Sequence, residues 1–234
     1  MKFPKIDYEF WLKNWHKTIG ENRVYTNKNM LEFIDYEKDI NSCTQEISCL
    51  VNSPKLNKKI ILRVVDLIYS WGGKSGRFYY DTSKNKPCYR KELELNTDLF
   101  LKYSKGIEYA KKGQSESKNI FEQISGIGAS YASKHAYFWS LHSDNPLIIV
   151  DSKIAGSLGY ETINQLNSNI NYRNLVTEFK NKSIEEFGEK NPMLIERALF
   201  AFHNHYFKND NSGWRRYKIE KDLVEAKLLA KELF

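Results

Sequence analysis

The apolar positions along the chain recur mainly at the three- and four-residue spacing of an α-helix. The clearest run is residues 60–68, which follows Pro54 and stops near Gly72 and Gly73. Alternation of apolar and polar residues, which is typical of a half-buried strand, is nearly absent. The pattern therefore predicts an all-α fold. The expected helices are 10–19, 30–34, 60–68, 97–110, 118–124, 131–141, 154–158, 172–187, 192–207 and 219–233.

Two stretches interrupt this periodicity. Residues 72–92 combine Gly, Ser, Asn and Pro with many Lys and Arg residues, which predicts a basic loop or a short irregular insert. Residues 204–216 form a polar connection, and no internal repeat is present. We expect one unit over residues 1–234. If it has two lobes, the basic stretch near residues 72–95 separates lobes 1–95 and 96–234.

Charge and cysteine content narrow the class of protein. The chain has 36 Lys and Arg against 29 Asp and Glu, a net charge of +7, which favours a polyanionic partner. Its three cysteines lack a Cys-x-x-Cys spacing, which fits a reducing compartment and excludes a four-cysteine cluster. Residues 1–17 do not resemble a signal peptide, and no apolar run reaches the roughly 18 residues of a membrane span. We expect a cytoplasmic protein without a membrane partner.

The segment 121–132 has the pattern of a helical hairpin. An apolar helix is expected to end at Ile124, Gly126 and Gly128 form a tight turn around one apolar residue, and a second helix begins at once. The first N–H groups of that helix can bind a backbone phosphate. Ala132 is small enough to let the two helices pack closely. The alternative is an ordinary αα-hairpin without a ligand.

An apolar run that starts at Pro146 ends in a carboxylate, Asp151, at the beginning of another short helix. Aspartate is a common helix N-cap, so Asp151 has a purely structural interpretation. Its position 23 residues after Gly128 leaves a second, functional interpretation open.

With the hairpin, Pro146, Val150 and Asp151, residues 118–160 resemble the HhH-GPD superfamily of DNA glycosylases, in its 8-oxoguanine glycosylase branch of compact bacterial type. The resemblance implies two helical lobes flanking a cleft, with the helix-hairpin-helix at 118–143 at its edge. It implies base-excision repair chemistry, with Asp151 as an essential residue and no cofactor. Similar compact bacterial proteins occur in anti-phage defence operons, so operon-encoded protein partners are a further expectation.

The chain departs from this family at the lysine. Bifunctional members carry the nucleophilic lysine two positions after the second hairpin glycine, and Ser130 stands there. The nearest amine is Lys134, one turn later on the same face, about 6 Å further along the helix axis. A long lysine stem can cover that offset, which makes Lys134 the candidate nucleophile. The alternative is a solvated or phosphate-contacting lysine.

The resemblance implies a definite reaction on duplex DNA. A purine-like damaged or modified base is flipped out, Asp151 stabilises the cationic sugar, and Lys134 captures C1′ as a Schiff base before β-elimination. If Lys134 points away, water is the nucleophile and the enzyme is a monofunctional hydrolase. If Asp151 only caps a helix, the fold binds nucleic acid or a partner without cutting it. We expect the protein to be a monomer.

Further candidate residues fall into three groups. Phosphate contacts are expected from the hairpin and the basic stretch, although that stretch is equally well explained as a solvated loop. By resemblance, the late helix supplies aromatic walls for the flipped base, against the alternative that these rings are core. His203 and His205 stand two apart on a helix and cannot share a metal ion, so no metal site is expected. The phosphate candidates are Gly126, Gly128, Ser130, Lys74 and Arg77, and the base-pocket candidates are Phe202, Phe207 and His203.

Overall fold

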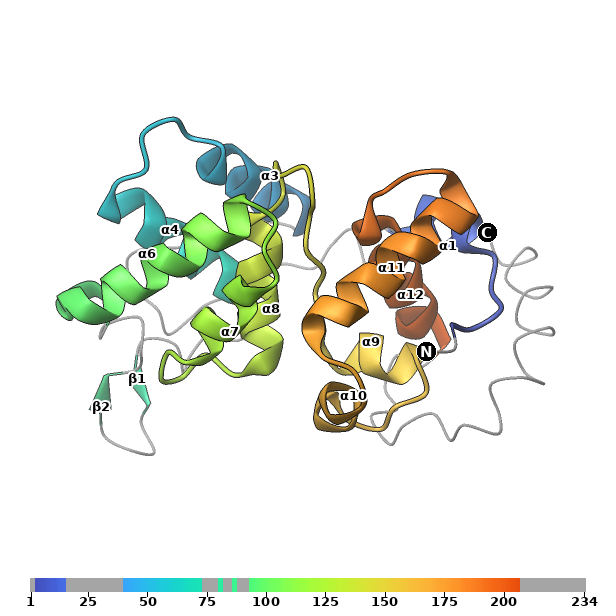
Figure 1. Cartoon of the computed structure of the whole chain (residues 1–234). Helices are drawn as coiled ribbons and strands as arrows, with labels where there is room; N and C mark the ends of the chain where they lie inside the picture. Colours follow the sequence, from blue (N-terminus) through green and yellow to red (C-terminus); the bar gives the residue numbers. More distant parts are fainter. Residues whose placement is uncertain (1–2, 16–39, 73–79, 82–85, 88–92, 207–234) are drawn as a thin grey trace. The chain divides into compact units, whose positions relative to one another are not determined.

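The computed structural model of the chain describes residues 3–15, 40–72, 80–81, 86–87 and 93–206 (Figure 1). Nearly all of the regular structure in these ranges is helical, which confirms the all-α prediction there. The chain divides into two compact units: the first combines Met1–Ile19 with Ile148–Phe234, and the second is Gly20–Leu147. Within the described ranges, no helix has the length and apolar character that crossing a bilayer requires.

The second unit is built around α8 (Ala129–Trp139), the helix that follows the Gly-Ile-Gly turn. Every residue of α8 from 131 to 139 is buried. A helix that is covered on all sides must lie at the centre of its unit. The helices that contact α8 are α3 (Ile40–Val51), α4 (Lys58–Trp71), α6 (Thr97–Lys111) and α7 (Glu116–Glu122).

The chain does not divide at the predicted point between residues 95 and 96. The helix before that point, α4, and the helix after it, α6, both pack on α8. Residues on either side of position 95 therefore share one hydrophobic core, and the basic stretch between them is an insert within the unit. Its described parts include two short antiparallel strands, β1 (Tyr80–Asp81) and β2 (Lys86–Pro87).

The first unit is built around α12 (Pro192–Tyr206). This helix contacts α1 (Tyr8–Lys13), α9 (Ser152–Ser157) and α11 (Tyr172–Phe187), while α10 (Ile163–Asn169) packs on α9. Trp11 of α1 is 2% exposed and packs edge to face on Phe202 of α12, with ring centroids 5.6 Å apart. The start of the chain is thus part of the same core as its later third.

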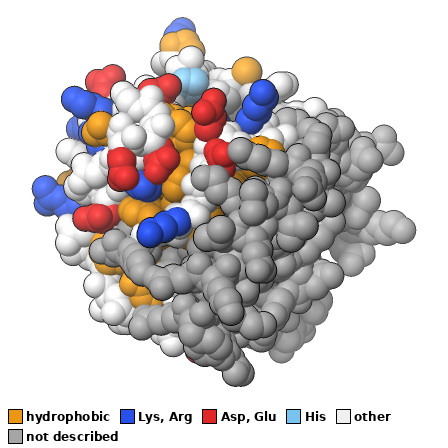
Figure 2. Space-filling view, turned by 90° about the vertical axis from the view of Figure 1, so that its right-hand side faces the viewer, with side chains coloured by type: hydrophobic (Ala, Val, Ile, Leu, Met, Phe, Trp, Pro, Cys, Tyr) orange, Lys and Arg blue, Asp and Glu red, His pale blue; other side chains and the backbone are white. Residues whose placement is uncertain are grey.

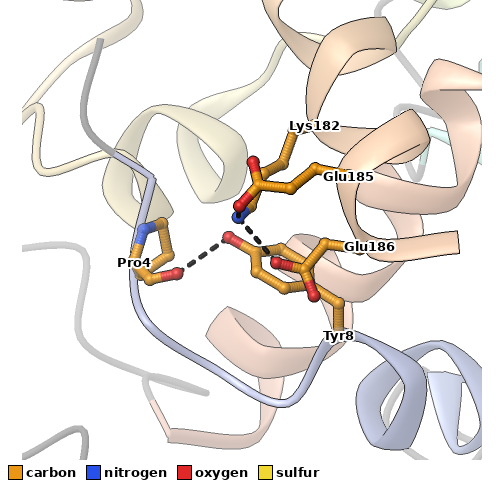
Figure 3. Close-up of polar contacts among 5 residues, drawn as sticks. All are labelled: Pro4, Tyr8, Lys182, Glu185 and Glu186. Atoms are coloured by element: carbon orange, nitrogen blue, oxygen red, sulfur yellow. Dashed lines mark hydrogen bonds and ion pairs between the residues drawn. The ribbon is translucent and has the colours of Figure 1, made fainter.

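A polar cluster fixes the start of the chain to α11 (Figure 3). The Tyr8 hydroxyl donates to the Pro4 carbonyl at 2.8 Å. The Lys182 ammonium lies 5.3 Å from the centroid of the Tyr8 ring and pairs with Glu185 at 2.9 Å and Glu186 at 2.6 Å. Burial lowers the pKa of Lys182, but the two carboxylates together outweigh it and raise this pKa, which favours the charged form.

Most of the predicted helices in the described ranges are present, and two helices were not predicted. The expected ranges 60–68, 97–110, 172–187 and 192–207 correspond to α4, α6, α11 and α12. The missed helices are α3 and α10. α10 buries only Leu166 and so has little apolar periodicity, while α3 has no charged residue in its first or last turn to mark its ends. The expected helices 30–34 and 219–233 lie outside the described residues.

Candidate functional site

The helical hairpin is formed by α7 and α8. α7 ends at Glu122, two residues before the expected end at Ile124, because the chain tightens there into a turn in which the Ile124 N–H donates to the Phe121 carbonyl at 3.0 Å. Gly126 has a φ of 90°, a left-handed conformation that favours glycine, which confirms the predicted turn. Gly128 is the N-cap of α8 with an ordinary φ of −76°.

Gly128 therefore does not need to be glycine for its backbone angles. It is exposed, and a Cβ built on it would meet nothing within 4 Å. It also has no side chain that could accept hydrogen bonds from the first N–H groups of α8. The main chain at the start of α8 is thus open to the close approach of an external acceptor such as a phosphate oxygen.

Lys134 directs its amine back along α8 toward the hairpin. Its Nζ donates to Ser130 Oγ at 3.0 Å and lies 5.4 Å from the centroid of the Tyr131 ring. Helical side chains lean toward the N-terminus of their helix, and Lys134 follows this rule. The side chain is almost fully buried, at 5% exposure. The amine consequently stands one turn before its own Cα, level with Ser130.

A buried polar network lies beside this lysine in the second unit. Tyr131 stacks on Tyr69 of α4, with ring centroids 4.4 Å apart. The Trp139 indole N–H donates to the Tyr103 hydroxyl at 3.0 Å, and that hydroxyl lies 2.7 Å from His135 Nδ1. Burial, reinforced by the charge of Lys134, lowers the pKa of His135 to about 3, so the imidazole is neutral at pH 7.

Asp151 is the N-cap of α9, as its structural interpretation predicts. Its Oδ1 accepts hydrogen bonds from the backbone N–H groups of Lys153 at 3.0 Å and Ile154 at 3.2 Å. The apolar run before it, residues 147–150, is buried, so the carboxylate is presented at the end of a fixed segment. A cap uses one carboxylate oxygen as an acceptor and leaves the charge of the group in place.

The base-pocket candidates lie on α12, the central helix of the first unit. Phe202 is 1% exposed against Trp11 and so has the position of a core residue. His203 lies near Asp151: burial and the charge of Lys153 lower the pKa of His203 to about 4, while Asp151 acts in the opposite direction. Phe207, Lys74 and Arg77 lie outside the described residues.

Two separate groups of candidates are thus brought together, each within its own unit. The second unit holds Lys134, Ser130 and the two hairpin glycines, and the first unit holds Asp151 and His203. Sequence reasoning missed Lys153 and Asn204, whose side chains are hydrogen-bonded to each other beside Asp151. Asn204 stands between His203 and His205, and nothing local in the sequence indicates its contact with Lys153, 51 positions earlier. In the described part of the chain, no three His, Cys, Asp or Glu side chains are grouped to hold a metal ion.

The surface and the comparisons with other proteins complete the description of the site. On the face drawn in Figure 2, the described surface carries Asp and Glu side chains interspersed with Lys and Arg. A basic patch is therefore not apparent on that part of the face.

No family model, curated protein or solved structure matches the chain.

Proposed function

We propose that the chain is a DNA N-glycosylase with lyase activity that flips out and removes a damaged or modified base. The observation that carries the proposal is the 3.0 Å hydrogen bond from Lys134 Nζ to Ser130 Oγ. It places an amine level with the residue at which bifunctional glycosylases of the resembled family carry their nucleophilic lysine. The open main chain at Gly128, directly after the turn at Gly126, supports a phosphate contact beside it.

The proposed chemistry assigns one role to each charged residue. The N-glycosidic bond breaks through a sugar with cationic character, and the resemblance assigns the stabilisation of that charge to the Asp151 carboxylate. The Lys134 amine, once it has lost a proton, forms a bond to C1′ as the base leaves with the bonding electrons. The C1′–O4′ bond of the resulting aminal then breaks and O4′ takes up a proton, which leaves a Schiff base between Lys134 and C1′. Loss of a proton from C2′ expels the 3′ phosphate by β-elimination and cuts the strand on the 3′ side.

Borohydride trapping tests the proposal directly. The protein is incubated with a panel of duplexes that carry different damaged or modified bases, and with reductant. We expect a covalent protein–DNA adduct with at least one duplex, because borohydride reduces a Schiff base to a stable amine. Lys134→Ala abolishes the adduct. Lys118→Ala is the matched control, since it removes another buried lysine of the same hairpin, one that pairs with Glu122 at 2.5 Å.

Base release without any adduct would replace the bifunctional mechanism by a monofunctional one, in which water attacks C1′. Neither release nor adduct over the whole panel would refute the glycosylase for the bases tested.

The second candidate function is binding of nucleic acid without catalysis. It is favoured by the surroundings of Lys134, because a hydroxyl oxygen and the face of the Tyr131 ring both suit a charged ammonium group. It is also favoured by the capping role of Asp151, which by itself explains an aspartate at that position. Retained DNA binding with no base release would support this candidate against the enzyme.

A further inference from the structure

Lys153 connects the Asp151 carboxylate to α12. The backbone N–H of Lys153 donates to Asp151 Oδ1 at 3.0 Å and forms part of the cap of α9. The ammonium group of the same residue donates to Asn204 Oδ1 and lies 5.3 Å from the centroid of the Phe200 ring, and both of these partners belong to α12. Lys153 therefore contacts the carboxylate through its main chain and the central helix through its side chain.

The short helix α9 depends on such contacts for its direction. It has six residues, and a helix of that length is not stable by itself in water. Its last residue is held on α12 by the bond from Ser157 Oγ to the Leu199 carbonyl at 3.0 Å, and its first turn is held there by Lys153. Ile154 and Ala155 of the same turn are buried as well, so the Lys153 side chain adds to a packed contact, and its loss lets the capping end of the helix open more often.

The charge of Lys153 also acts on His203 of α12. The charged groups that act most strongly on His203 are Lys153, which lowers its pKa, and Asp151, which raises it. A protonated His203 would attract the Asp151 carboxylate and offset its charge. Burial and, after it, the charge of Lys153 both oppose that protonation, so no positive imidazole stands beside the Asp151 carboxylate.

We infer that Lys153 is a positioning residue for Asp151, which it holds by tying the first turn of α9 to Asn204 of α12. The catalytic consequence rests on the proposed function, because it assumes that Asp151 stabilises the sugar cation. The structural part stands on the contacts within the first unit.

The first test measures positioning without any enzymatic activity. Hydrogen exchange of the Lys153 and Ile154 amides, which donate to Asp151, is compared in the full-length wild type and three variants: Lys153→Met, Lys153→Arg and Asn204→Ala. We expect Lys153→Met and Asn204→Ala to raise both exchange rates by about tenfold or more, because the first turn opens more often. The conservative Lys153→Arg keeps them slow. Unchanged rates in Lys153→Met and Asn204→Ala would overturn the inference.

The second test follows the charge of Lys153 by NMR titration of the His203 ring. We expect the pKa of His203, about 4 in the wild type, to rise in Lys153→Met and to stay low in Lys153→Arg. A merely structural lysine would not separate the two variants in this way. If Lys153→Met does not fold, Asn204→Ala, which keeps the lysine, still provides the exchange test.

The third test connects positioning to catalysis. On a duplex that the wild type processes, we expect Lys153→Met to lower the single-turnover rate about 10- to 100-fold, as loss of a supporting residue does at other sites, with DNA affinity unchanged. An equal single-turnover rate in the wild type and Lys153→Met would overturn the catalytic role of the bond from Lys153 to Asn204. A wild type that releases no base refutes the proposed function instead, and leaves the exchange and titration tests to decide on Lys153.

Discussion

At the scale of single residues, Asp151 combines two tasks that substitutions can separate. Asparagine caps a helix as well as aspartate does, because its Oδ1 accepts the same two N–H bonds that α9 offers, but it carries no charge. Alanine removes both the cap and the charge. The two variants therefore distinguish the structural interpretation of Asp151 from the catalytic one.

We predict that Asp151→Asn keeps the stability of the wild type and loses base release by about 100-fold or more, as expected when an electrostatic group is removed from a reacting centre. Asp151→Ala should in addition lower the free energy of unfolding by about 1 kcal/mol. Urea unfolding and single-turnover base release measure the two effects. Full base release by Asp151→Asn would show that the residue is a cap only.

His135 makes the stability of the second unit depend on pH. Its pKa is about 3 in the folded protein, against 6.5 for a free imidazole, so the unfolded chain binds a proton that the folded chain excludes. Stability is therefore complete above pH 6.5 and falls as the pH drops from 6.5 toward 3, by about 1.4 kcal/mol per pH unit from this residue.

The prediction is checked by urea unfolding between pH 7 and pH 4.5 for the wild type and His135→Gln, which removes the titrating group. We expect the variant to lose less stability over this range, while His203, whose pKa is also lowered, keeps a residual pH dependence of the same sign in both proteins. If the free energy of unfolding falls equally with pH in the wild type and in His135→Gln, the role given to His135 is contradicted.

At the scale of helices, the packing of α6 on α7 depends on one missing side chain. A Cβ added to Gly106 of α6 would lie 2.6 Å from the ring of Phe121, which is fully buried on α7. In an open helix, Gly→Ala stabilises by about 0.5–1 kcal/mol. Here the overlap with a ring that cannot move aside outweighs that gain.

We predict that Gly106→Ala destabilises the protein by about 1–3 kcal/mol, a typical cost of overpacking a core. The double variant Gly106→Ala/Phe121→Leu should lose less free energy of unfolding than the two single variants lose together, because leucine leaves room for the methyl group. Thermal or urea unfolding of the four proteins gives the coupling. Additive effects would mean that the two positions do not compete for space.

The sequence predicts a helix or a contact when the residues that determine it are close together in the chain, and not when they are far apart. The long helices α4, α6, α11 and α12 follow from apolar periodicity, and the backward reach of Lys134 follows from the direction of side chains on any helix. The bond from Lys153 to Asn204 joins residues 51 positions apart and has no local signal. For the same reason, the sequence did not show that Phe202 lies buried against Trp11.

At the scale of the whole molecule, the net charge of +7 leads us to expect that the proposed binding to DNA depends on salt. Each phosphate that the protein neutralises should contribute about −0.9 to the slope of log affinity against log salt concentration. We predict that Lys74→Ala and Arg77→Ala each make the slope of log affinity against log salt concentration shallower by about 0.9, the contribution of one phosphate. Lys190→Ala, which removes an exposed lysine next to α12, is the control and should leave the slope unchanged. Fluorescence anisotropy at several salt concentrations measures these slopes, and binding that is independent of salt would contradict a phosphate footprint.

The division into units is the feature of the whole molecule that the sequence concealed. No composition change marks residue 19 or residue 147, and the first unit is assembled from segments far apart in the chain. Its unity comes from contacts such as Trp11 with Phe202, which exist only after folding. Local patterning therefore placed the boundary at the most irregular stretch, which instead lies inside the second unit.

This discontinuous first unit has a consequence for the newly made chain. A ribosome adds about 5–20 residues each second, so Gly20–Leu147 can fold some seconds before α12 has been synthesised. During that interval Trp11, later buried, has no partner helix and exposes its indole to water and to chaperones. We therefore expect Gly20–Leu147 to fold before the first unit, and α1 to be covered only after α12 has been made.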